Sequence, residues 1–371
     1  MTHPSLNPLF HAFPALEARL PHVTLGDFPT PVHQMKDLED CLGVQDLYVK
    51  REDKSSPLYG GNKIRKLEFL LGKAVRDRAT HTITFGYAGS NHTLATAVFA
   101  RELGLSPISI HLPQHNARYV RKNLLYQERL GAAMYQFDGL NAIRMGIARI
   151  ILGRLLSTGR LPSIFPPGGS SVPGVVGVVS SIFELKGQIE GGELPEPDLI
   201  YLPVGSCGTA AGVLLGVKAA GLKSRVVGIA VAPEKFSNKK NIIRLFNDTA
   251  HLLVKLEPNF PKVSISESDF DMNHDCIGAG YACFTEDGMR CVQTFSETED
   301  ITLEGTYTGK TGAGLIADAE SGRLDGKTTL FWNTHNSVDF TEKISGADYR
   351  NLPKRYHRYF EEEYQPLEKT D

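Results

Sequence analysis

The stretch HTITFGYAGSNHTLATAVFARELGLSPISIHLP, residues 81–113, decides the fold class of this chain. Its first eight residues are largely apolar or β-branched and predict a buried strand over 81–88. A helical pattern follows over 91–105, and a second strand-like run covers 106–113. Because a helix between two buried strands is typical of a parallel crossover, the stretch predicts an α/β fold with a parallel sheet.

The same alternation of strands and helices continues over most of the chain. It predicts helices over 117–132 and 140–159, and strands over 133–137, 198–204, 225–232 and 328–334. The stretch 253–275 shows little periodicity, and we expect an irregular insertion there. The whole pattern predicts an α/β protein in which mostly parallel sheets are flanked by helices.

Composition excludes several classes of protein. The 371 residues are enough for about two domains, and 41% hydrophobic with 22% charged residues is typical of a globular protein. A net charge of −2 gives no reason to expect a nucleic acid partner, and no apolar run is long enough to span a membrane. We therefore expect neither nucleic acid nor membrane as a partner. The N-terminal residues lack a signal-peptide pattern, and the five cysteines form no CxxC pair, so we expect a cytoplasmic protein.

Four glycine-containing or polar turns are expected at strand or helix boundaries, where open α/β sheets bind ligands. They cover residues 60–63, 86–93, 203–212 and 331–337. In HLPQH, residues 111–115, a proline separates two histidines and prevents them from lying on one face of a helix. We therefore expect no metal site there.

The turn at 203–212, PVGSCGTAAG, is typical of a phosphate site. It would bring backbone N–H groups to a helix N-terminus, where they and the helix dipole favour an anion. The residues of this predicted phosphate cup are Gly205, Ser206, Cys207, Gly208 and Thr209. A closely packed turn without a ligand remains an equal alternative. The Gly-Lys-Thr sequence at 309–311 is excluded as a nucleotide loop, because Glu304 stands where that motif requires glycine.

The turn SNHT, residues 90–93, has two interpretations. Ser90 or Asn91 could simply cap the helix that follows, which is worth about 1 kcal/mol. The turn could also hold the carboxylate of a substrate through side-chain donors and free N–H groups. Both interpretations stay open on the sequence of the turn alone.

Lys63 stands at the wrong end of its helix. In YGGNKIRKLEFLL, residues 59–71, the lysine follows two glycines and begins an amphipathic helix, although the helix dipole favours cations at the last turn. A desolvated lysine becomes a nucleophile toward aldehydes. Pyridoxal 5′-phosphate offers both an aldehyde and a phosphate, so a lysine of this kind together with a phosphate cup favours it as the cofactor.

The chain resembles the pyridoxal-phosphate enzymes of the tryptophan synthase β superfamily, fold type II. Within that superfamily it is most similar to the 1-aminocyclopropane-1-carboxylate deaminase / D-cysteine desulfhydrase family. The resemblance covers about residues 15–340, and the lysine segment VKREDKSSPLYGGNKIRKLEFLLGKA is its most specific part. The segments GSNHT, FPPGGSSVPGVVG, GSCGTAAG, GAGYACFTEDG and TYTGKTGAGL follow in the expected order.

The resemblance implies a role for each matching residue. Lys63 would be the Schiff-base lysine and would move protons. The catalytic set would be Lys63, Ser90 and Tyr307. The cofactor would contact Lys63, Asn62, Asn91, Thr334 and residues 205–209, with the Thr334 hydroxyl facing the pyridine nitrogen. The substrate would contact Ser90, Asn91, His92, Tyr281 and Tyr307. A hydroxyl beside the pyridine nitrogen makes the ring a weaker electron sink, which favours β-elimination over transamination.

Three departures from the family pattern bear on the substrate. Gly89 replaces a frequent glutamine, and His335 and Asn336 replace two glycines of the final Thr-Gly-Gly motif. Thr308 follows Tyr307 where deaminases of the cyclopropane substrate have glutamate. The resemblance therefore implies α,β-elimination from D-cysteine or a related β-substituted amino acid, giving pyruvate, ammonia and the leaving group.

Alternatives remain. The same cofactor could serve 1-aminocyclopropane-1-carboxylate deaminase, D-serine dehydratase or racemase chemistry. The chain could also be a non-catalytic small-molecule-binding member of the fold, or a phosphate-binding protein without the cofactor. The resemblance further implies a homodimer with two domains per chain. The large cofactor-binding domain would comprise 1–65 and 181–371, and the small domain 66–180.

Overall fold

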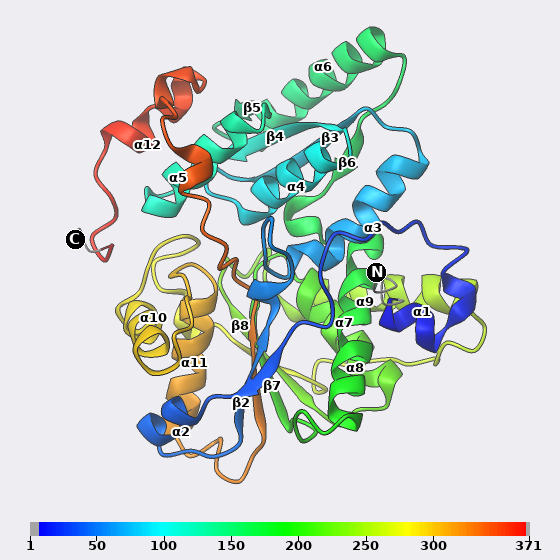
Figure 1. Cartoon of the computed structure of the whole chain (residues 1–371), viewed down its shortest axis with the longest axis vertical. Coiled ribbons are helices and arrows are strands. Elements are labelled where there is room, and N and C mark those ends of the chain that lie inside the picture. The colour runs from blue at the N-terminus through cyan, green and yellow to red at the C-terminus, as the bar shows by residue number, and fades with distance from the viewer. Residues whose placement is uncertain (1–6, 369–371) are drawn as a thin grey trace. The chain divides into compact units, whose positions relative to one another are not determined.

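Two mostly parallel sheets carry the fold (Figure 1). The computed structural model describes residues 7–368. The larger sheet has the order β1-β2-β10-β7-β8-β9, in which only the β1–β2 pair is antiparallel, and the smaller has the order β5-β4-β3-β6. The strands are β1 (Val32–Gln34), β2 (Leu47–Arg51), β3 (His81–Tyr87), β4 (Ser106–Leu112), β5 (Ala133–Gln136), β6 (Ser163–Phe165), β7 (Leu199–Val204), β8 (Arg225–Ala230), β9 (Asp271–Asn273) and β10 (Thr329–Asn333).

The helices alternate with these strands, which confirms the predicted fold class. They are α1 (Pro8–Ala12), α2 (Lys36–Leu42), α3 (Lys63–Arg76), α4 (Asn91–Glu102), α5 (Arg118–Arg129), α6 (Leu140–Thr158), α7 (Val172–Glu190), α8 (Gly208–Ala220), α9 (Lys239–Leu256), α10 (Glu286–Glu299), α11 (Thr308–Glu320) and α12 (Arg358–Glu361). None of the helices in the described part of the chain is long and apolar enough to cross a membrane.

The prediction of an irregular insertion over 253–275 is partly wrong. Helix α9 continues to Leu256, with Leu253 fully buried on its inner face. Strand β9 then pairs in parallel with β8 and adds an edge strand to the larger sheet. Three-residue strands carry too little periodicity to be recognised in sequence, so only the stretch between these two elements is irregular.

Two compact units divide the chain. Within the described residues, the first unit comprises 7–69 and 170–337, and the second comprises 70–169 and 338–368. Residues 338–368 thus belong with the smaller sheet, whereas the predicted domains placed them in the large domain. The assignment of cofactor binding to a large domain stays a prediction.

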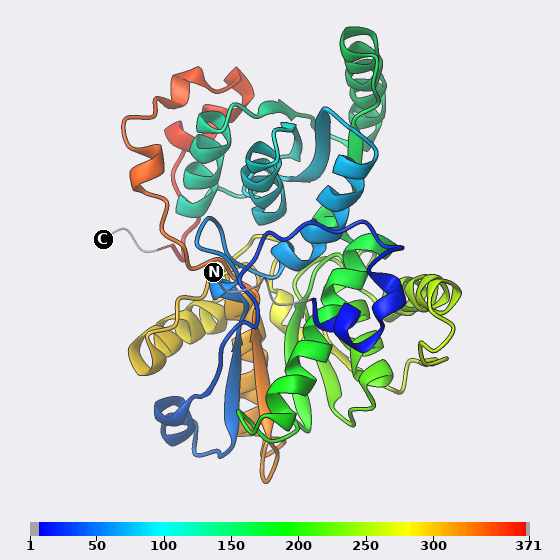
Figure 2. The ribbon, with the colours of Figure 1, turned by 45° about the vertical axis from the view of Figure 1, so that its right-hand side comes forward.

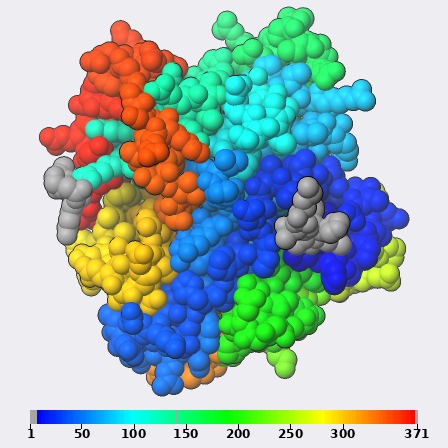
Figure 3. Space-filling view, viewed as in Figure 1, coloured from blue at the N-terminus to red at the C-terminus, as the bar shows by residue number. Residues whose placement is uncertain are grey.

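The C-terminal segment joins the second unit through buried tyrosines. Tyr356 and Tyr359 are fully buried, and the Tyr356 hydroxyl lies 2.8 Å from His111 Nδ1 on β4. The backbone N–H of Gln114 donates to the Tyr359 hydroxyl at 3.2 Å. In Figure 3 the orange and red surface of this segment lies against teal surface of the same unit. The polar sequence of the segment gives no local sign of these two buried tyrosines.

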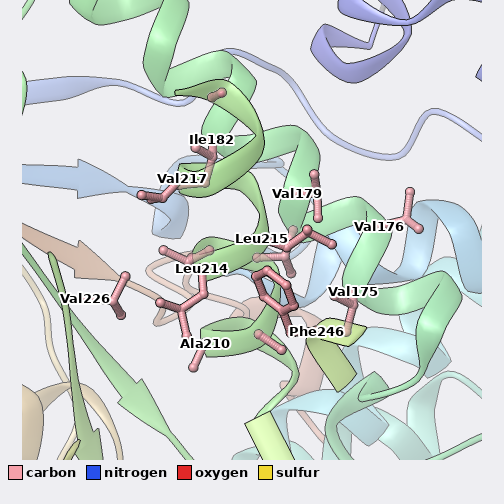
Figure 4. Packing of buried hydrophobic residues seen from close by; sticks show 14 of the residues in the cluster. Val175, Val176, Val179, Ile182, Ala210, Leu214, Leu215, Val217, Val226 and Phe246 are labelled. Atoms are coloured by element: carbon pink, nitrogen blue, oxygen red, sulfur yellow. The ribbon is translucent and has the colours of Figure 1, made fainter. Parts of the chain in front are cut away.

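The core of the first unit lies on both faces of the larger sheet. Helices α7, α8 and α9 pack on one face, and Figure 4 shows Val175, Leu214 and Phe246 among the side chains of that layer. Helices α2, α10 and α11 pack on the other face (Figure 1). Helices thus cover both faces of the sheet. Strands β7 and β10 are accordingly buried along their whole length, as expected of central strands in a parallel sheet.

A glycine allows α7 to approach α3 closely. A Cβ added at Gly177 would lie 1.8 Å from the Arg65 backbone oxygen, so neither helix can accept it without moving. We expect Gly177→Ala to lower the free energy of unfolding by about 1–3 kcal/mol. Gly187→Ala, in the same helix but with no atom within 4 Å, is the matched control and should raise it by about 0.5–1 kcal/mol. Urea unfolding compares them, and equal effects would contradict the close-packing argument.

Candidate active site

Three loops of the first unit meet at one edge of the larger sheet. Strands β2, β10 and β7 are adjacent and parallel, so their carboxyl ends lie at the same edge. The loops that leave these ends contain residues 52–63, 334–336 and 205–209 respectively. The topology therefore gathers the predicted lysine turn, the last predicted turn and the predicted phosphate cup, as the general rule for open α/β sheets anticipates.

Lys63 is the first residue of α3 and is joined by hydrogen bonds to the predicted cup. Its Nζ donates to Asn62 Oδ1 at 2.8 Å, and Asn62 Nδ2 donates to Thr209 Oγ1 at 3.0 Å. Burial lowers the pKa of the Lys63 amine to about 8, although the charge of Glu304 acts in the opposite direction. At pH 7 a pKa of about 8 leaves roughly a tenth of the lysine as neutral, nucleophilic amine, far more than an exposed lysine has.

The predicted cup is a turn between β7 and α8, with a glycine on each side of Cys207. Cys207 precedes the helix with φ 68°, in the left-handed region. The Gly208 N–H donates to Ser170 Oγ at 3.1 Å, and Ser170 Oγ lies 2.7 Å from Ser206 Oγ. A hydroxyl pair therefore stands at the mouth of a helix whose first N–H groups have no partner within the helix. Such a turn is chemically suited to a phosphate.

The loop after β10 is clamped onto the lysine turn. Asn336 Oδ1 accepts from the Gly60 N–H at 2.6 Å, and the backbone oxygen of Thr334 accepts from the Asn62 N–H at 3.4 Å. A Cβ on Gly61, whose φ is +97°, would lie 2.9 Å from the His335 oxygen, so this position requires glycine. Asn336 thus ties down a loop where the family pattern has glycine.

His335 brings an imidazole to the same loop. Burial lowers the pKa of His335, with smaller opposing effects from Glu304 and Asp53. Its Nδ1 is buried and has no hydrogen-bond partner among the described residues. A buried ring nitrogen of this kind calls for a partner, so the position is chemically suited to a bound polar group.

Tyr281 and Tyr307 lie together, and their role at the substrate stays a prediction. Their hydroxyls are 2.5 Å apart, and Lys63 Nζ lies 6.0 Å from the centroid of the Tyr307 ring. Glu304 holds Tyr307 in place, because its carboxylate accepts the backbone N–H groups of Thr306, Tyr307 and Thr308 at 2.7–2.9 Å. In the sequence, Glu304 indicated only that residues 309–311 are not part of a nucleotide loop. Its spacing before the first residues of α11 is the capping signal that was available.

The Gly-Lys-Thr sequence at 309–311 lies inside the first turns of α11. Lys310 Nζ donates to the backbone oxygens of Ile277 and Gly280, at 2.7 and 3.0 Å. The lysine therefore fixes the segment that carries Tyr281, and its role is structural.

In the second unit, Ser90 caps α4. Ser90 Oγ accepts from the Thr93 N–H at 3.3 Å, and Thr93 Oγ1 donates back to the Ser90 oxygen at 2.9 Å. Asn91 Oδ1 accepts from Asn123 Nδ2 at 3.0 Å, and His92 is buried. The capping interpretation of the SNHT turn is confirmed. The catalytic and binding roles of Ser90, Asn91 and His92 stay predictions.

Tyr119, Val120 and Gln114 explain the unusual glycine at position 89. The Gly89 N–H donates to Gln114 Oε1 at 2.8 Å, and Gln114 Nε2 donates to the Tyr119 hydroxyl at 2.8 Å. A Cβ on Gly89 would lie 2.6 Å from Tyr119 and 2.7 Å from Val120. Side chains of α5 thus take the space beside the turn, with Gln114 Nε2 next at 3.1 Å, and a larger residue at position 89 would clash with them.

The residues of the first unit fit pyridoxal 5′-phosphate. Lys63 offers a desolvated amine to the aldehyde, and the β7–α8 turn offers backbone N–H groups and hydroxyls to the phosphate. A Cβ on Gly205 would meet the Tyr307 ring at 3.4 Å, so glycine leaves this backbone accessible beside the tyrosine. The residues present therefore suit both the aldehyde and the phosphate of the cofactor.

Comparison with known proteins identifies the family. The sequence model described as pyridoxal-phosphate dependent enzyme matches residues 23–335. The chain belongs to this family of enzymes, whose cofactor is pyridoxal phosphate. It has the fold type II architecture within that class.

Relatives are known at about 30% identity. A Pyrococcus abyssi protein provisionally named 1-aminocyclopropane-1-carboxylate deaminase is 32% identical over 86% of this chain and 93% of its own length. D-cysteine desulfhydrase of Klebsiella pneumoniae is 30% identical over 80% of this chain and 88% of its own length. The crystal structure of a homologue of 1-aminocyclopropane-1-carboxylate deaminase matches with a TM-score of 0.75 and 30% identity, covering 92% of this chain and 99% of that one.

Proposed function

We propose that this enzyme is a lyase that catalyses α,β-elimination from D-cysteine or a related β-substituted amino acid. D-cysteine and water would give pyruvate, ammonia and hydrogen sulfide. The observation that carries the proposal is the amine of Lys63, whose pKa is about 8 and which is linked through Asn62 to Thr209 of the cup. Relatives named D-cysteine desulfhydrase support the substrate class.

Each proposed residue has a defined task. Bound pyridoxal phosphate supplies an electron sink for the pair of electrons left at the substrate α-carbon. Lys63 would hold the cofactor and would move a proton at the substrate α-carbon. The turn at 205–209 would bind the phosphate, and Thr334 would offer its hydroxyl to the pyridine nitrogen. Tyr281 and Tyr307 line the substrate pocket.

The proposed contribution of the second unit rests on the family resemblance. Ser90 would transfer a proton at the substrate, while Asn91 would contact the cofactor and His92 the substrate. Ser90 Oγ already accepts a backbone N–H, which leaves its own proton available to donate. Its proposed task is therefore compatible with its capping role.

Deamination of 1-aminocyclopropane-1-carboxylate is the second candidate, favoured by the names of the relatives at 32% identity. The resemblance places glutamate after the pocket tyrosine in such deaminases, and Thr308 stands there in this chain. Thr308 is fully buried, and its hydroxyl accepts from the Glu304 N–H at 3.0 Å. A hydroxyl so engaged cannot replace a carboxylate as a base, which supports the desulfhydrase assignment.

A substrate panel tests the assignment. The enzyme is loaded with pyridoxal phosphate and given D-cysteine, L-cysteine, D-serine or 1-aminocyclopropane-1-carboxylate. Sulfide and pyruvate are measured for the cysteines, pyruvate for serine, and 2-oxobutanoate for the cyclopropane. We expect the highest kcat/KM for D-cysteine. Release of 2-oxobutanoate at a higher kcat/KM would replace the assignment with the deaminase, and no turnover in a loaded protein would favour a binding role.

We also propose a cytoplasmic homodimer. All five cysteines are free, which is compatible with a reducing compartment. The homodimer rests on the family resemblance, and light scattering coupled to size-exclusion chromatography measures the mass directly.

A further inference from the structure

Exposed apolar side chains gather in one stretch of the second unit. Eight large hydrophobic residues are exposed in the described part of the chain, and six of them lie between positions 145 and 164. They are Met145 (70% exposed), Leu152 (55%), Leu155 (38%), Leu156 (78%), Leu161 (62%) and Ile164 (50%). Isolated exposed leucines are ordinary, but a cluster of this kind marks an interaction surface.

Helix α6 carries apolar side chains on two opposite faces. Ile143, Ile147, Ile150 and Ile151 pack against the isoleucines of β3 and β4 in the core of the second unit. Met145, Leu152 and Leu156 follow one another at intervals of seven and four residues, which places them in one stripe. At 100° per residue this stripe lies roughly opposite the core-facing isoleucines. The fold therefore uses one apolar face of α6 and leaves the other to solvent.

The surface around this stripe is cationic. Between Asp138 and Glu184 the sequence contains no acidic residue, whereas α6 and the segment after it contain Arg144, Arg149, Arg154 and Arg160. Arg144 and Arg149 are exposed, and neither has an ion-pair partner among residues 7–368. Arg160 is exposed as well and adds further positive charge, and its guanidinium donates at 3.0 Å to the backbone oxygen of Arg78.

We propose that the exposed face of α6 docks on an anionic phospholipid surface. Leucine and methionine side chains would enter the acyl boundary while the arginines contact the phosphate headgroups. Figures 1 and 2 show α6 as an outlying helix of the second unit, and its exposed side chains include Met145, Leu152 and Leu156. The expectation of no membrane partner rested on the lack of a spanning segment, which surface docking does not require.

Charge argues against pairing of α6 with the α6 of a second copy of this chain. Pairing two exposed α6 faces would bring the arginines of both copies together without an intervening carboxylate, and like charges in contact are unfavourable. An anionic lipid surface instead complements both features of this face. This proposal does not depend on the identity of the substrate.

Vesicle co-sedimentation of the full-length holoenzyme tests the proposal. Vesicles of phosphatidylcholine with about 30% phosphatidylserine should bind the protein, and pure phosphatidylcholine should bind it at least about tenfold less. Raising the salt to about 0.5 M should release it, because screening weakens the arginine contacts. Failure of the wild type to bind the anionic vesicles would overturn the proposal.

Two paired variants separate the apolar and charged contributions. Leu152→Ser with Leu156→Ser should weaken binding at least about tenfold, and Arg144→Gln with Arg149→Gln should weaken it by about 25-fold. Phe236→Ser is the matched control, since Phe236 is 45% exposed on the first unit and should leave binding unchanged. An equal loss in this control would overturn the assignment to α6. Self-association that the leucine variant abolishes, without vesicle binding by the wild type, would assign the face to a second copy.

The variants must remain folded for this comparison. All the substituted side chains are exposed, so we expect unchanged thermal midpoints and unchanged turnover in the absence of vesicles. If the leucine variant unfolds, the arginine variant alone decides, because its loss of binding with intact turnover still requires an electrostatic contact at α6.

Discussion

Lys63→Ala is expected to reduce turnover at least about 10³-fold and to remove covalently held cofactor from the purified protein. The reason is that Lys63 combines a nucleophilic amine with a hydrogen-bonded link, through Asn62, to Thr209 of the β7–α8 turn. Absorbance spectra of the wild type and the variant, with and without added pyridoxal phosphate, report attachment. Sulfide release from D-cysteine reports turnover.

Lys73→Ala is the control for Lys63→Ala. Lys73 lies on the same helix, but its side chain is 46% exposed, and we expect a normal spectrum and normal turnover.

The pH dependence of covalent attachment provides a second check on Lys63. Because the amine of Lys63 has a pKa of about 8, the attachment rate should rise with pH and level off above about 8. A rate that continues to rise toward pH 10 would indicate an ordinary exposed lysine.

Arg65→Met is expected to lower the free energy of unfolding by about 3–5 kcal/mol. The Arg65 guanidinium donates to Glu52 and Glu184 at 2.7–3.0 Å, and all three side chains are buried. Lys50 Nζ lies 2.6 Å from the same Glu184, so two cations and two anions balance. Without Arg65, one buried carboxylate loses its counter-charge. Chemical denaturation measures the loss.

Arg290→Met serves as the comparison for Arg65→Met. It breaks an exposed pair with Asp287, in which both side chains are more than 70% exposed, and should change stability by less than about 0.5 kcal/mol. A similarly small effect of Arg65→Met would show that the buried cluster contributes little.

The pH dependence of stability gives a further check on the cluster. Burial by itself raises the pKa of Glu184, but Arg65 and Lys50 outweigh this effect and hold the pKa at about 2, against an ordinary 4.5. The carboxylate therefore stabilises the fold fully above about pH 4.5, and this contribution is lost as the pH falls toward 2. The difference between the wild type and Arg65→Met should accordingly be largest above pH 4.5 and shrink in acid.

Hydrophobic periodicity predicted the long elements well, because buried parallel strands and their crossover helices leave strong local patterns. Strand β3 begins at the predicted residue and ends one residue early, and α6 differs from its prediction by one residue at its end. The short strand β9 and the buried tyrosines of the C-terminal segment leave no such pattern. Their positions depend on pairing with β8 and on contacts with β4, which are distant in sequence.

The candidate site was predictable where a residue type is unusual for its position. Lys63 at a helix start and the glycines around Cys207 are local signals of this kind. Ser170, Glu304 and Gln114 were missed as site residues, since each acts by supporting another residue through a contact that only the fold creates. The clamp from Asn336 to Gly60 joins positions 276 residues apart and could not be deduced from one sequence.

The interleaving of the two units bears on how the protein is made. Strand β10 lies between β2 and β7 in the larger sheet, yet its residues are synthesised well after those of both neighbours. The second unit also waits for residues 338–368. At about 5–20 residues per second, synthesis of the roughly 125 residues between β7 and β10 takes about 6–25 s. During that time the nascent chain holds two strands whose central neighbour does not yet exist, and chaperones that shield apolar edges should raise its yield.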